Sequence, residues 1–389
     1  GGARAHTHTH TLSPPLCMSV MEGGRGRAVQ GGGGVAASRS SSNSKSFVPA
    51  QPGSVLLGKY RVEKEVGSGT YGVVYKATNL ENGEVVAIKQ FDVPPKDDVP
   101  ITLLRELRLL MALKRKRVEL EAGSHETLLH SGALSVVDFK GVTMSESGND
   151  IFMIMGYCEH NLFNLCKVHR GKFTVEHLKY FARELIKGVS FCHSHNILHR
   201  DIKGENILVG KDGAVKIADF GLSRMYNPER MTPKVFSRWY RPPELLLGSS
   251  VYDQSCDIWA LGCYIAELFC HGTPLIRGDN DLDQLEKTYA ICGTPDMKDW
   301  PEVKSLPNWD SMRPKQLRQC HITECLDRRH RQRSVFQNME DYVNFKSLIC
   351  QMVQLNPKKR ISADAALDHS FFWDGVAIQL PPPNLLSLE

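Results

Sequence analysis

Three residues with oxygen-bearing side chains, Asp201, Asn206 and Asp219, are the strongest candidates for chemistry in this sequence. They lie in the segment ILHRDIKGENILVGKDGAVKIADFGLSR. Residues 207–209 are predicted to form a short strand and Asp212-Gly213 a turn. Residues 214–219 are then predicted to return as an antiparallel strand. This hairpin would bring Asp219 back beside Asn206, and two converging oxygen ligands suit Mg²⁺. Asp201 could accept the proton of an attacking hydroxyl group.

A glycine-rich hairpin lies upstream of this segment. Apolar and polar residues alternate in RVEKEV and again in VVYKAT, and GSGTYG between them holds Gly67, Gly69 and Gly72 in GxGxxG spacing. Without side chains, their backbone N–H groups can close over phosphate oxygens. Alone, this spacing is a weak signal, and a flexible hairpin turn would be the better interpretation of it. A Rossmann-type site would need the glycines to open a helix, whereas here they lead into a second strand.

A lysine and a glutamate complete the set of candidates. Lys89 interrupts the apolar strand EVVAIKQF, and Glu106 lies on an amphipathic helix that begins near Pro100. If they pair, Glu106 orients the ammonium group toward the α and β phosphates of a nucleotide; otherwise they are an ordinary solvated lysine and a surface acid. The order GxGxxG, VAIK and HRD-KxxN-DFG favours the pair, because its chance occurrence is rare.

With these motifs, residues 58 to 375 resemble a eukaryotic protein kinase. The resemblance implies an α+β fold with two lobes, ATP between them, and Mg²⁺ held by Asn206 and Asp219. A small antiparallel lobe with one signature helix would span about 56–157, a hinge about 158–161, and a larger, mainly helical lobe about 162–375. Residues 1–55 would form a disordered Gly/Ser-rich tail and residues 376–389 a short C-terminal extension. Lys203, two residues after Asp201, matches the serine/threonine pattern and would steady the transferring phosphoryl group.

The resemblance also implies the other residues of the nucleotide site and its supports. ATP would be bound by Val66, Gly67, Ser68, Gly69, Thr70, Tyr71, Gly72, Val73, Val74, Ala87, Lys89, Met155, Gly156 and Cys158. Glu244 would pair with Arg360 to anchor the activation segment, and Asp257 would brace the catalytic loop. The chain departs from the usual pattern with Met155 at the gatekeeper position, Gly156 at the first hinge position and Asn161 in place of a common aspartate. Inhibitor binding is where these departures matter.

Within this family, the sequences PITLLRE, GTYG, WYRPPELLLG, DQLEKTYAICGTPD and WPEV resemble cyclin-dependent kinases. The likeness implies a cyclin partner, and Gly204 and the PPE variant favour transcription-associated members over cell-cycle members. Two alternatives are a mitogen-activated kinase and a pseudokinase scaffold. The first needs a Thr-x-Tyr that residues 225–232 lack, and the second would have lost the lysine, the base or a metal ligand.

Regulation and substrate choice follow from the same likeness. Thr232 matches the activating phosphorylation site, and Arg105, Arg200 and Arg224 match the residues that bind its phosphate. Thr70 and Tyr71 would be inhibitory phosphorylation sites. The substrate pocket would contain Phe236, Ser237, Arg238 and Arg241, with a strained backbone at Phe236 whose carbonyl Arg241 holds. Substrates would therefore carry serine or threonine followed by proline, as in the RNA polymerase II tail.

The composition limits which cellular compartments and which kinds of partner are expected. The net charge is +5, and residues 1–55, with five basic residues and one acid, carry +4 of it. The remaining 43 basic and 42 acidic residues are too nearly balanced to suggest a nucleic-acid surface. No apolar run is long enough to span a membrane. Eleven cysteines without CxxC spacing indicate a reducing compartment, the nucleus or the cytoplasm.

Two segments leave alternatives open. Residues 114–129 form an insert after the signature helix, and its KRKR is either a nuclear-import signal or a solvated helix end. The start of the chain is rich in arginine and serine like a transit peptide, but it lacks amphipathic periodicity and does not begin with methionine, so Met18 or Met21 could be the initiator. Its HTHTHT stretch could bind a metal ion, although a flexible segment without a binding role is the simpler interpretation.

Overall fold

The computed structural model describes residues 49–69, 72–93, 99–146, 148, 150–332 and 334–388. These residues form two compact units. The first contains the described residues up to Val93 together with those of Val142–Ile154, and the second contains the described residues of Asp98–Gly141 and Met155–Glu389. The predicted tail, apart from residues 49–55, lies outside the described part, as does the HTHTHT stretch.

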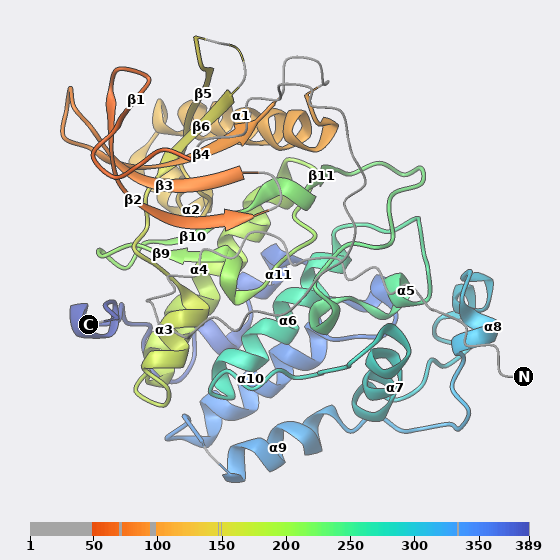
Figure 1. The fold of residues 1–389 in the computed structure, drawn as a ribbon. Coiled ribbons are helices and arrows are strands. Elements are labelled where there is room, and N and C mark those ends of the chain that lie inside the picture. The colour runs from red at the N-terminus through yellow and green to blue at the C-terminus, as the bar shows by residue number, and fades with distance from the viewer. Residues whose placement is uncertain are drawn as a thin grey trace, which may run out of the picture. The chain divides into compact units, whose positions relative to one another are not determined.

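The first unit is built on an antiparallel sheet with the strand order β1-β2-β3-β4-β6-β5 (Figure 1). The strands are β1 (Val55–Leu56), β2 (Tyr60–Gly69), β3 (Gly72–Asn79), β4 (Val85–Asp92), β5 (Phe139–Met144) and β6 (Asp150–Gly156). The β2–β3 hairpin closes with Gly69 opposite Gly72, as the sequence alternation predicts. Buried side chains of β3, β4 and β6, among them Ile88 and Phe152, form its core.

Residues 49–54 pack on this sheet, ahead of the boundary expected at residue 56. The Ala50 N–H donates to the buried Tyr75 hydroxyl at 2.9 Å. The Gly53 N–H donates to the carbonyl of Val62, whose own N–H donates to Ser54. Backbone hydrogen bonds therefore fix a stretch whose polar composition gave no sign of order.

The second unit is mainly helical and carries two small sheets of short strands. Its helices are α1 (Ile101–Glu121), α2 (His125–His130), α3 (Leu162–Val168), α4 (Val175–Ser194), α5 (Pro243–Leu246), α6 (Ser255–Phe269), α7 (Asp281–Cys292), α8 (Trp309–Met312), α9 (Ile322–Gln332), α10 (Met339–Met352) and α11 (Ala363–Leu367). Its strands are β7 (His160–Asn161), β8 (Ile197–Leu198), β9 (Ile207–Val209), β10 (Val215–Ile217) and β11 (Arg224–Met225). β9 pairs with β7 and β10, and β8 pairs with β11.

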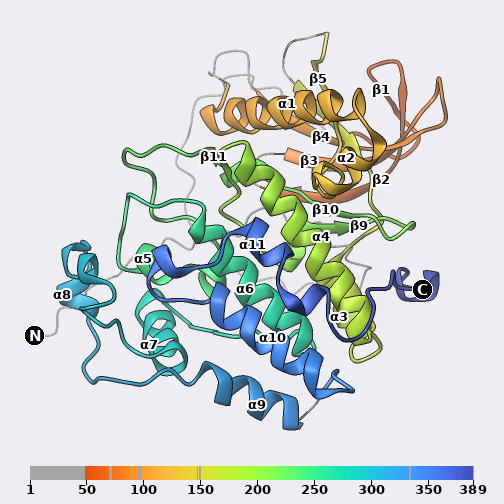
Figure 2. The ribbon, with the colours of Figure 1, turned by 180° about the vertical axis from the view of Figure 1, so that it is seen from behind.

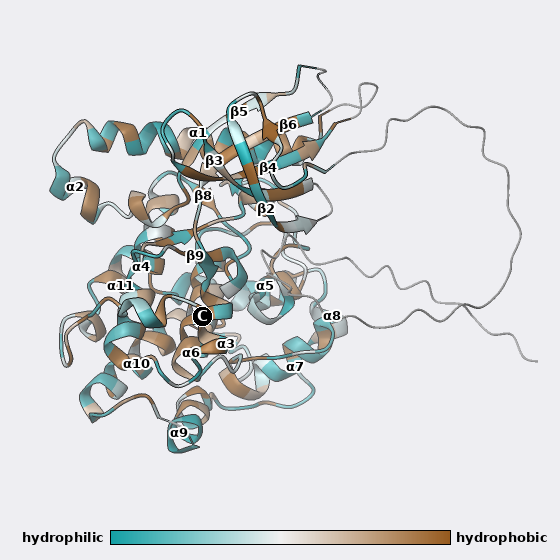
Figure 3. Ribbon diagram, turned by 60° about the vertical axis from the view of Figure 1, so that its left-hand side comes forward, coloured by the Kyte–Doolittle hydropathy of each residue, from teal (hydrophilic) through white to brown (hydrophobic). Residues whose placement is uncertain are grey.

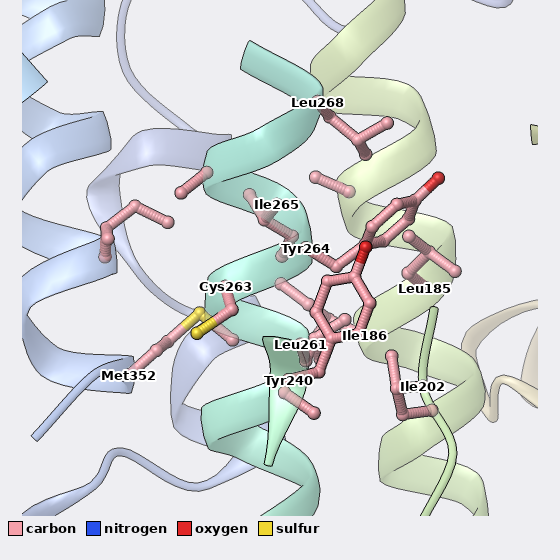
Figure 4. Close-up of a cluster of buried hydrophobic side chains, with 14 of the residues drawn as sticks. Leu185, Ile186, Ile202, Tyr240, Leu261, Cys263, Tyr264, Ile265, Leu268 and Met352 are labelled. Carbon is pink, nitrogen blue, oxygen red and sulfur yellow. The ribbon is translucent and has the colours of Figure 1, made fainter. Parts of the chain in front are cut away.

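Helix α6 lies at the centre of this unit. Its residues from Cys256 to Phe269 are all buried, which is expected of a helix that is apolar on every side (Figure 3). Leu185 and Ile186 of α4 flank it on one side, and Met352 of α10 lies beside it on the other (Figure 4). From behind, α10 and α11 are seen against α6 and α4 respectively (Figure 2). No helix of the described chain is long and apolar enough to cross a membrane.

The signature helix begins directly after Pro100, as predicted, but it is longer than expected. The helix falls in the second compact unit, where it packs on the turn Phe220–Leu222 and on α2. The insert does not form a separate link. It continues α1 to Glu121 and then adds α2, which Ser124 caps by accepting a hydrogen bond from the Thr127 N–H.

The C-terminal extension packs on the helical unit. Leu385 and Leu386 are buried in its main core, and the Ser387 carbonyl lies 2.5 Å from Nε2 of His169. The fully buried Lys179 donates to Asp341 at 2.5 Å and to the carbonyls of Asp374 and Val376. The extension is thus fixed to α4 and α10 by a satisfied buried charge as well as by apolar contacts.

Candidate active site

The loop between β8 and β9 gathers polar groups around Asp201. This buried carboxylate accepts hydrogen bonds from Lys203 Nζ at 2.7 Å and from Asn206 Nδ2 at 2.8 Å on one oxygen. Its other oxygen accepts from the Ser237 hydroxyl at 3.0 Å and from the Ser237 N–H at 3.2 Å. Four donors hold one carboxylate in a single orientation, which suits a group that must receive a proton at a defined point.

The β9–β10 hairpin forms in the register expected from the Asp-Gly turn, with Ile207 opposite Ile217. The Ala218 N–H donates to the Asn206 carbonyl at 2.9 Å, so Asp219 follows directly on the residue that is bonded to Asn206. Asp219 has a left-handed backbone (φ 62°), and its side chain accepts from the Gly221 N–H at 3.4 Å. The predicted return of Asp219 toward Asn206 is therefore present in the backbone.

The described residues satisfy the side chain of Asn206 only in part. Its amide nitrogen donates twice to Asp201, whereas its buried Oδ1 has no hydrogen-bond partner among the described residues. An orphaned buried carbonyl oxygen is costly unless a ligand satisfies it, and hard cations prefer such oxygens. The described residues include no group of three or more His, Cys, Asp or Glu side chains able to hold a metal ion. Two protein oxygens with phosphate oxygens and water are the usual set for Mg²⁺, and these residues fit it.

Buried Asp257, near the start of α6, supports the loop from behind. It accepts hydrogen bonds from the backbone N–H groups of His199 and Arg200, both at 2.8 Å, and from His193 Nε2 at 3.0 Å. Burial alone would raise the pKa of Asp257, but these donors together hold it below its ordinary value. The carboxylate stays ionised and fixes the backbone that precedes Asp201, as the family resemblance implies.

Lys89 and Glu106 are both buried, although they belong to different units. Lys89 lies on β4 opposite Val74 of β3, which places it next to the glycine-rich hairpin. Glu106 lies on α1, and a Cβ atom added to Gly221 would lie 3.8 Å from its Oε2 atom. The structure therefore places Glu106 beside the turn that follows Asp219. The ion pair between Lys89 and Glu106 stays a prediction.

The other expected nucleotide residues fall into two groups. Val66, Gly67, Val73, Val74 and Ala87 are buried positions of β2, β3 and β4, Ser68 is exposed, and Gly69 and Gly72 close the hairpin. Thr70 and Tyr71 lie outside the described residues. Met155 and Gly156 end β6, and Cys158 follows.

Local contacts explain the unusual residues of this stretch. The Gly156 N–H donates to the Asp138 carbonyl at 2.8 Å, and an added Cβ would lie 3.2 Å from the Asp138 Cβ, so glycine suits the close approach. Burial raises the pKa of Cys158 to about 12, which keeps its thiol neutral. Asn161 caps α3 by accepting from the Asn164 N–H at 2.8 Å, a role that an aspartate could fill equally well.

The activation segment places Thr232 near a cluster of positive charge. Its carbonyl accepts from the Tyr252 hydroxyl at 2.7 Å, and the same hydroxyl accepts from Arg200 Nη1 at 2.8 Å. The Thr232 side chain is exposed. Burial, and then the charges of Arg224 and Arg200, lower the pKa of Arg105, so the three predicted arginines lie close enough to repel one another.

The predicted strain at Phe236 is present. Its φ angle is 65°, a left-handed value that is costly for a residue with a side chain. Its carbonyl accepts from Arg241 Nη2 at 2.9 Å, and its N–H donates to the Arg200 carbonyl. Arg238 is exposed and contacts Asp281, which also accepts from Arg241 at 2.9 Å. The strained carbonyl is therefore occupied by an arginine, as we expected.

The anchor between Glu244 and Arg360 is also present. Two parallel hydrogen bonds of 2.7 and 2.6 Å join the guanidinium group to the carboxylate, and both side chains are buried. This bidentate pair links the end of the activation segment to the chain after α10.

Three residues around the site were not predicted from the sequence. Tyr252 connects Thr232 to Arg200, Asp281 neutralises Arg241, and Tyr264 packs against Gly204. An added Cβ on Gly204 would lie 2.7 Å from the Tyr264 hydroxyl. None of the three stands in a recognisable motif, and each lies 20 or more residues from its partner along the chain, so no local signal could have identified them.

The fold and this constellation of residues define the class of the protein. A model of the protein kinase domain matches residues 60–372, and the chain therefore belongs to the protein kinase family. ATP and Mg²⁺ are the phosphoryl donor and the cofactor that this family uses.

Similar proteins narrow the class further. The chain is 35% identical to "Cyclin-dependent kinase C-2" of Oryza sativa subsp. japonica, over 80% of this chain and 58% of that protein. It is 33% identical to "CTD kinase subunit alpha" of Schizosaccharomyces pombe, over 84% of this chain and 49% of that protein. It is 34% identical to "Cyclin-dependent kinase 12" of Caenorhabditis elegans, over 80% of this chain and 40% of that protein. The match spans between two fifths and three fifths of each relative's length.

Proposed function

We propose that this chain is a cyclin-dependent serine/threonine protein kinase that phosphorylates Ser/Thr-Pro sites. The observation that carries the proposal is the arrangement of Asp201, Lys203 and Asn206, with a buried Asn206 Oδ1 left for a cation. All residues whose loss would indicate a pseudokinase scaffold are present in the sequence. The Thr-x-Tyr of a mitogen-activated kinase is absent from residues 225–232.

The chemistry rests on positioning and charge. Mg²⁺, when bound with ATP, neutralises the charge that develops on the phosphates. In our proposal Asn206 and Asp219 hold the cation, and Lys89, oriented by Glu106, contacts the α and β phosphates. Asp201 accepts the proton of the substrate hydroxyl, and Lys203, held 2.7 Å from it, steadies the transferring group. Ser237 donates to the other Asp201 oxygen and keeps the carboxylate turned toward the substrate.

Proline selection follows from the strained turn at Phe236. Arg241 occupies the Phe236 carbonyl, so a substrate N–H that enters there finds no acceptor. Stranding that N–H costs about 1 to 3 kcal/mol, whereas proline has no N–H to strand. The same figures correspond to roughly a five- to 150-fold preference.

Activation would need two events. A cyclin would hold α1 so that Glu106 faces Lys89, and a phosphate on Thr232 would tie together Arg105, Arg200 and Arg224. The mutual repulsion of these arginines supports the second event, because a dianion would relieve it. Phosphates on Thr70 or Tyr71 would inhibit. The names of the similar proteins, "Cyclin-dependent kinase C-2" and "Cyclin-dependent kinase 12" among them, support a cyclin partner. We infer that the kinase acts in the nucleus, on the RNA polymerase II tail.

Paired peptides test the proposal. We would phosphorylate Thr232 in the cyclin-bound protein and compare kcat/KM for two peptides that differ only in Ser-Pro against Ser-Ala. The proposal requires a clear preference for Ser-Pro, and an Arg241→Lys variant, which cannot hold the Phe236 carbonyl with the same fork geometry, should reduce it. Equal kcat/KM for the two peptides in the unmutated protein would disprove proline selection.

A further inference from the structure

Asp138 joins the C-terminal part of helix α1 to the end of strand β6. Its carboxylate lies 3.2 Å from Nη1 of Arg117 on α1 and 3.0 Å from Nζ of Lys140, two residues further along the chain. Its carbonyl accepts a hydrogen bond from the N–H of Gly156, the last residue of β6, at 2.8 Å. All four residues belong to the second unit. One residue therefore contacts the insert with its side chain and the expected nucleotide site with its backbone.

The charges around Asp138 keep it ionised although it is half-buried. Burial would raise the pKa of this carboxyl, but the hydrogen bond from Lys140 and the charges of Arg117 and Lys216 hold it below its ordinary value. Lys216 lies on β10, where its ammonium group donates to the carbonyl of Leu134. Burial, and then the charge of Arg117, lower the pKa of Lys216, so these cations repel one another. Asp138 is therefore a shared counter-charge for cations from α1, β5 and β10.

Arg117 reaches Asp138 because the insert lengthens α1. It is the last residue of KRKR, on the part of α1 that stands in place of the expected link. Its Nε donates to Glu121 at 2.8 Å, four residues further along the same helix, which holds the guanidinium group in place. Its buried Nη1 has no hydrogen-bond partner among the described residues, so the contact with Asp138 is an ion pair rather than a directed hydrogen bond.

The side chain of Asp138 also lies against the backbone of Gly156. A Cβ added to Gly156 would lie 3.2 Å from the Asp138 Cβ and 3.8 Å from its Oδ2. Asp138 thus borders the space that a side chain at position 156 would enter. Because the two residues are this close and share a hydrogen bond, a shift of Asp138 is transmitted to Gly156.

We propose that Arg117 and Asp138 are positioning residues for the nucleotide: their ion pair fixes Asp138, and Asp138 in turn holds Gly156 where nucleotide binding requires it. The inference rests on the proposed function, in which Gly156 belongs to the ATP site, and it adds the insert to the parts of the chain that set nucleotide affinity. Neither Arg117 nor Asp138 is assigned a contact with the nucleotide. A pair that served the fold alone would change the Tm and leave that affinity as it is.

The experiment measures the Kd of Mg·ADP for the full chain by calorimetry, so it needs neither turnover nor a cyclin. Arg117→Met and Asp138→Asn remove the charge from either side of the ion pair with little change in side-chain size. Lys116→Met is the matched control, because Lys116 is the neighbouring residue of α1, is exposed and pairs with Glu119 instead. Arg117→Lys keeps the positive charge and tests for rescue. Circular dichroism and the Tm show whether each variant is folded.

We expect Arg117→Met and Asp138→Asn each to weaken Mg·ADP binding by about three- to tenfold, the size of effect that residues coupled to a site through others produce. The double variant should lose no more than either single variant, because both remove the same contact. Arg117→Lys should keep most of the affinity, and Lys116→Met should bind like the unmutated chain. With a peptide substrate, Arg117→Met should raise the KM for ATP and leave kcat unchanged.

Three results would count against the inference or its basis. If both folded variants bind Mg·ADP as tightly as the unmutated chain and differ from it only in Tm, the pair is structural, and the inference is overturned while the proposed function stands. An equal loss in Lys116→Met would overturn it as well, because the effect would then follow from the charge of α1 in general. If the unmutated chain does not bind Mg·ADP, the proposed function itself is wrong.

Discussion

Asn206 shows most directly how a single residue prepares the site. Its amide nitrogen donates two hydrogen bonds to Asp201, and its buried Oδ1 has no hydrogen-bond partner among the described residues. Leaving such an atom unsatisfied costs about 1 to 3 kcal/mol, and a bound cation would remove that cost. We therefore expect the site to gain stability when Mg²⁺ and nucleotide bind together.

A thermal-shift measurement tests this gain without any turnover. Mg·ADP should raise the Tm of the unmutated chain more than ADP with a chelator does, because ligands that bind only the folded state stabilise it. Asp219→Asn should remove most of the Mg²⁺-dependent part and keep the part due to ADP alone. An Mg²⁺-dependent shift that survives in both Asp219→Asn and Asn206→Ala would place the cation elsewhere.

The second prediction at this scale concerns Gly204 and Tyr264. An added Cβ on Gly204 would lie 2.7 Å from the Tyr264 hydroxyl and 3.0 Å from the Cβ atom of Phe163. Gly204→Ala should therefore destabilise the protein by about 1 to 3 kcal/mol, as overpacking does. Tyr264→Phe should be nearly neutral, because the buried hydroxyl has no hydrogen-bond partner in the described residues, and it should recover part of the loss in the double variant. Denaturant unfolding of the unmutated protein, the two single variants and the double variant measures these changes in the free energy of unfolding. If the changes in the two single variants add up to the change in the double variant, the two residues are not in contact.

Glu267 should make the stability of the folded protein depend on pH. Burial raises its pKa to about 7, although the Tyr240 hydroxyl donates to it at 2.8 Å. Because the folded pKa lies above the unfolded value, the protonated form is favoured by folding, and stability is lost as the pH rises from about 4.5 through 7. In the unmutated protein this term should lower the free energy of unfolding by about 2 to 3 kcal/mol between pH 5 and pH 8. Glu267→Gln should be less pH-dependent by that amount, and identical slopes for the two proteins would contradict the assignment.

Among the elements, those with short-range signals were predictable. The β2–β3 and β9–β10 hairpins follow from alternation and from their turn residues, and α1 begins where its proline indicated. The length of α1 was not predictable, since charged residues of good helix propensity continue it through KRKR where we expected a link. Lys114, Arg115 and Lys116 are exposed near its end, which agrees with a solvated helix and leaves the import signal untested.

One ion pair between elements carries a clear energetic prediction. Glu244 of α5 and Arg360 after α10 are both buried and paired through two hydrogen bonds. Removing one partner leaves the other charge buried and unpaired, so Arg360→Ala should lower the free energy of unfolding by about 3 to 5 kcal/mol. Glu244→Gln should cost less, because its carbonyl can still accept one bond. Urea unfolding measures both changes. If Arg360→Ala lowers the free energy of unfolding by less than about 1 kcal/mol, the pair does not act as an anchor.

At the scale of the whole molecule, motifs were sufficient to predict the class and the central residues, because they are fixed by local chemistry. Tyr252 and Asp281 could not be predicted, since their roles arise only when distant segments pack together. The same limit applies to the C-terminal extension, whose apolar Leu385 and Leu386 gave no indication that they would be buried against the helical unit. Long-range packing, rather than pattern, determines these parts.

Mg²⁺-dependent phosphoryl transfer by the residues around Asp201 is the activity from which the other proposals follow. The most direct measurement incubates the cyclin-bound chain with γ-labelled ATP and a Ser-Pro peptide, and compares the unmutated protein with Asp219→Asn and Asp201→Asn at matched concentration. We predict label on the peptide with the unmutated protein, and a loss of about a thousandfold or more in each variant, equivalent to several kcal/mol of transition-state stabilisation, with Tm nearly unchanged. Undiminished transfer by either folded variant would show that these residues do not carry out the phosphoryl transfer.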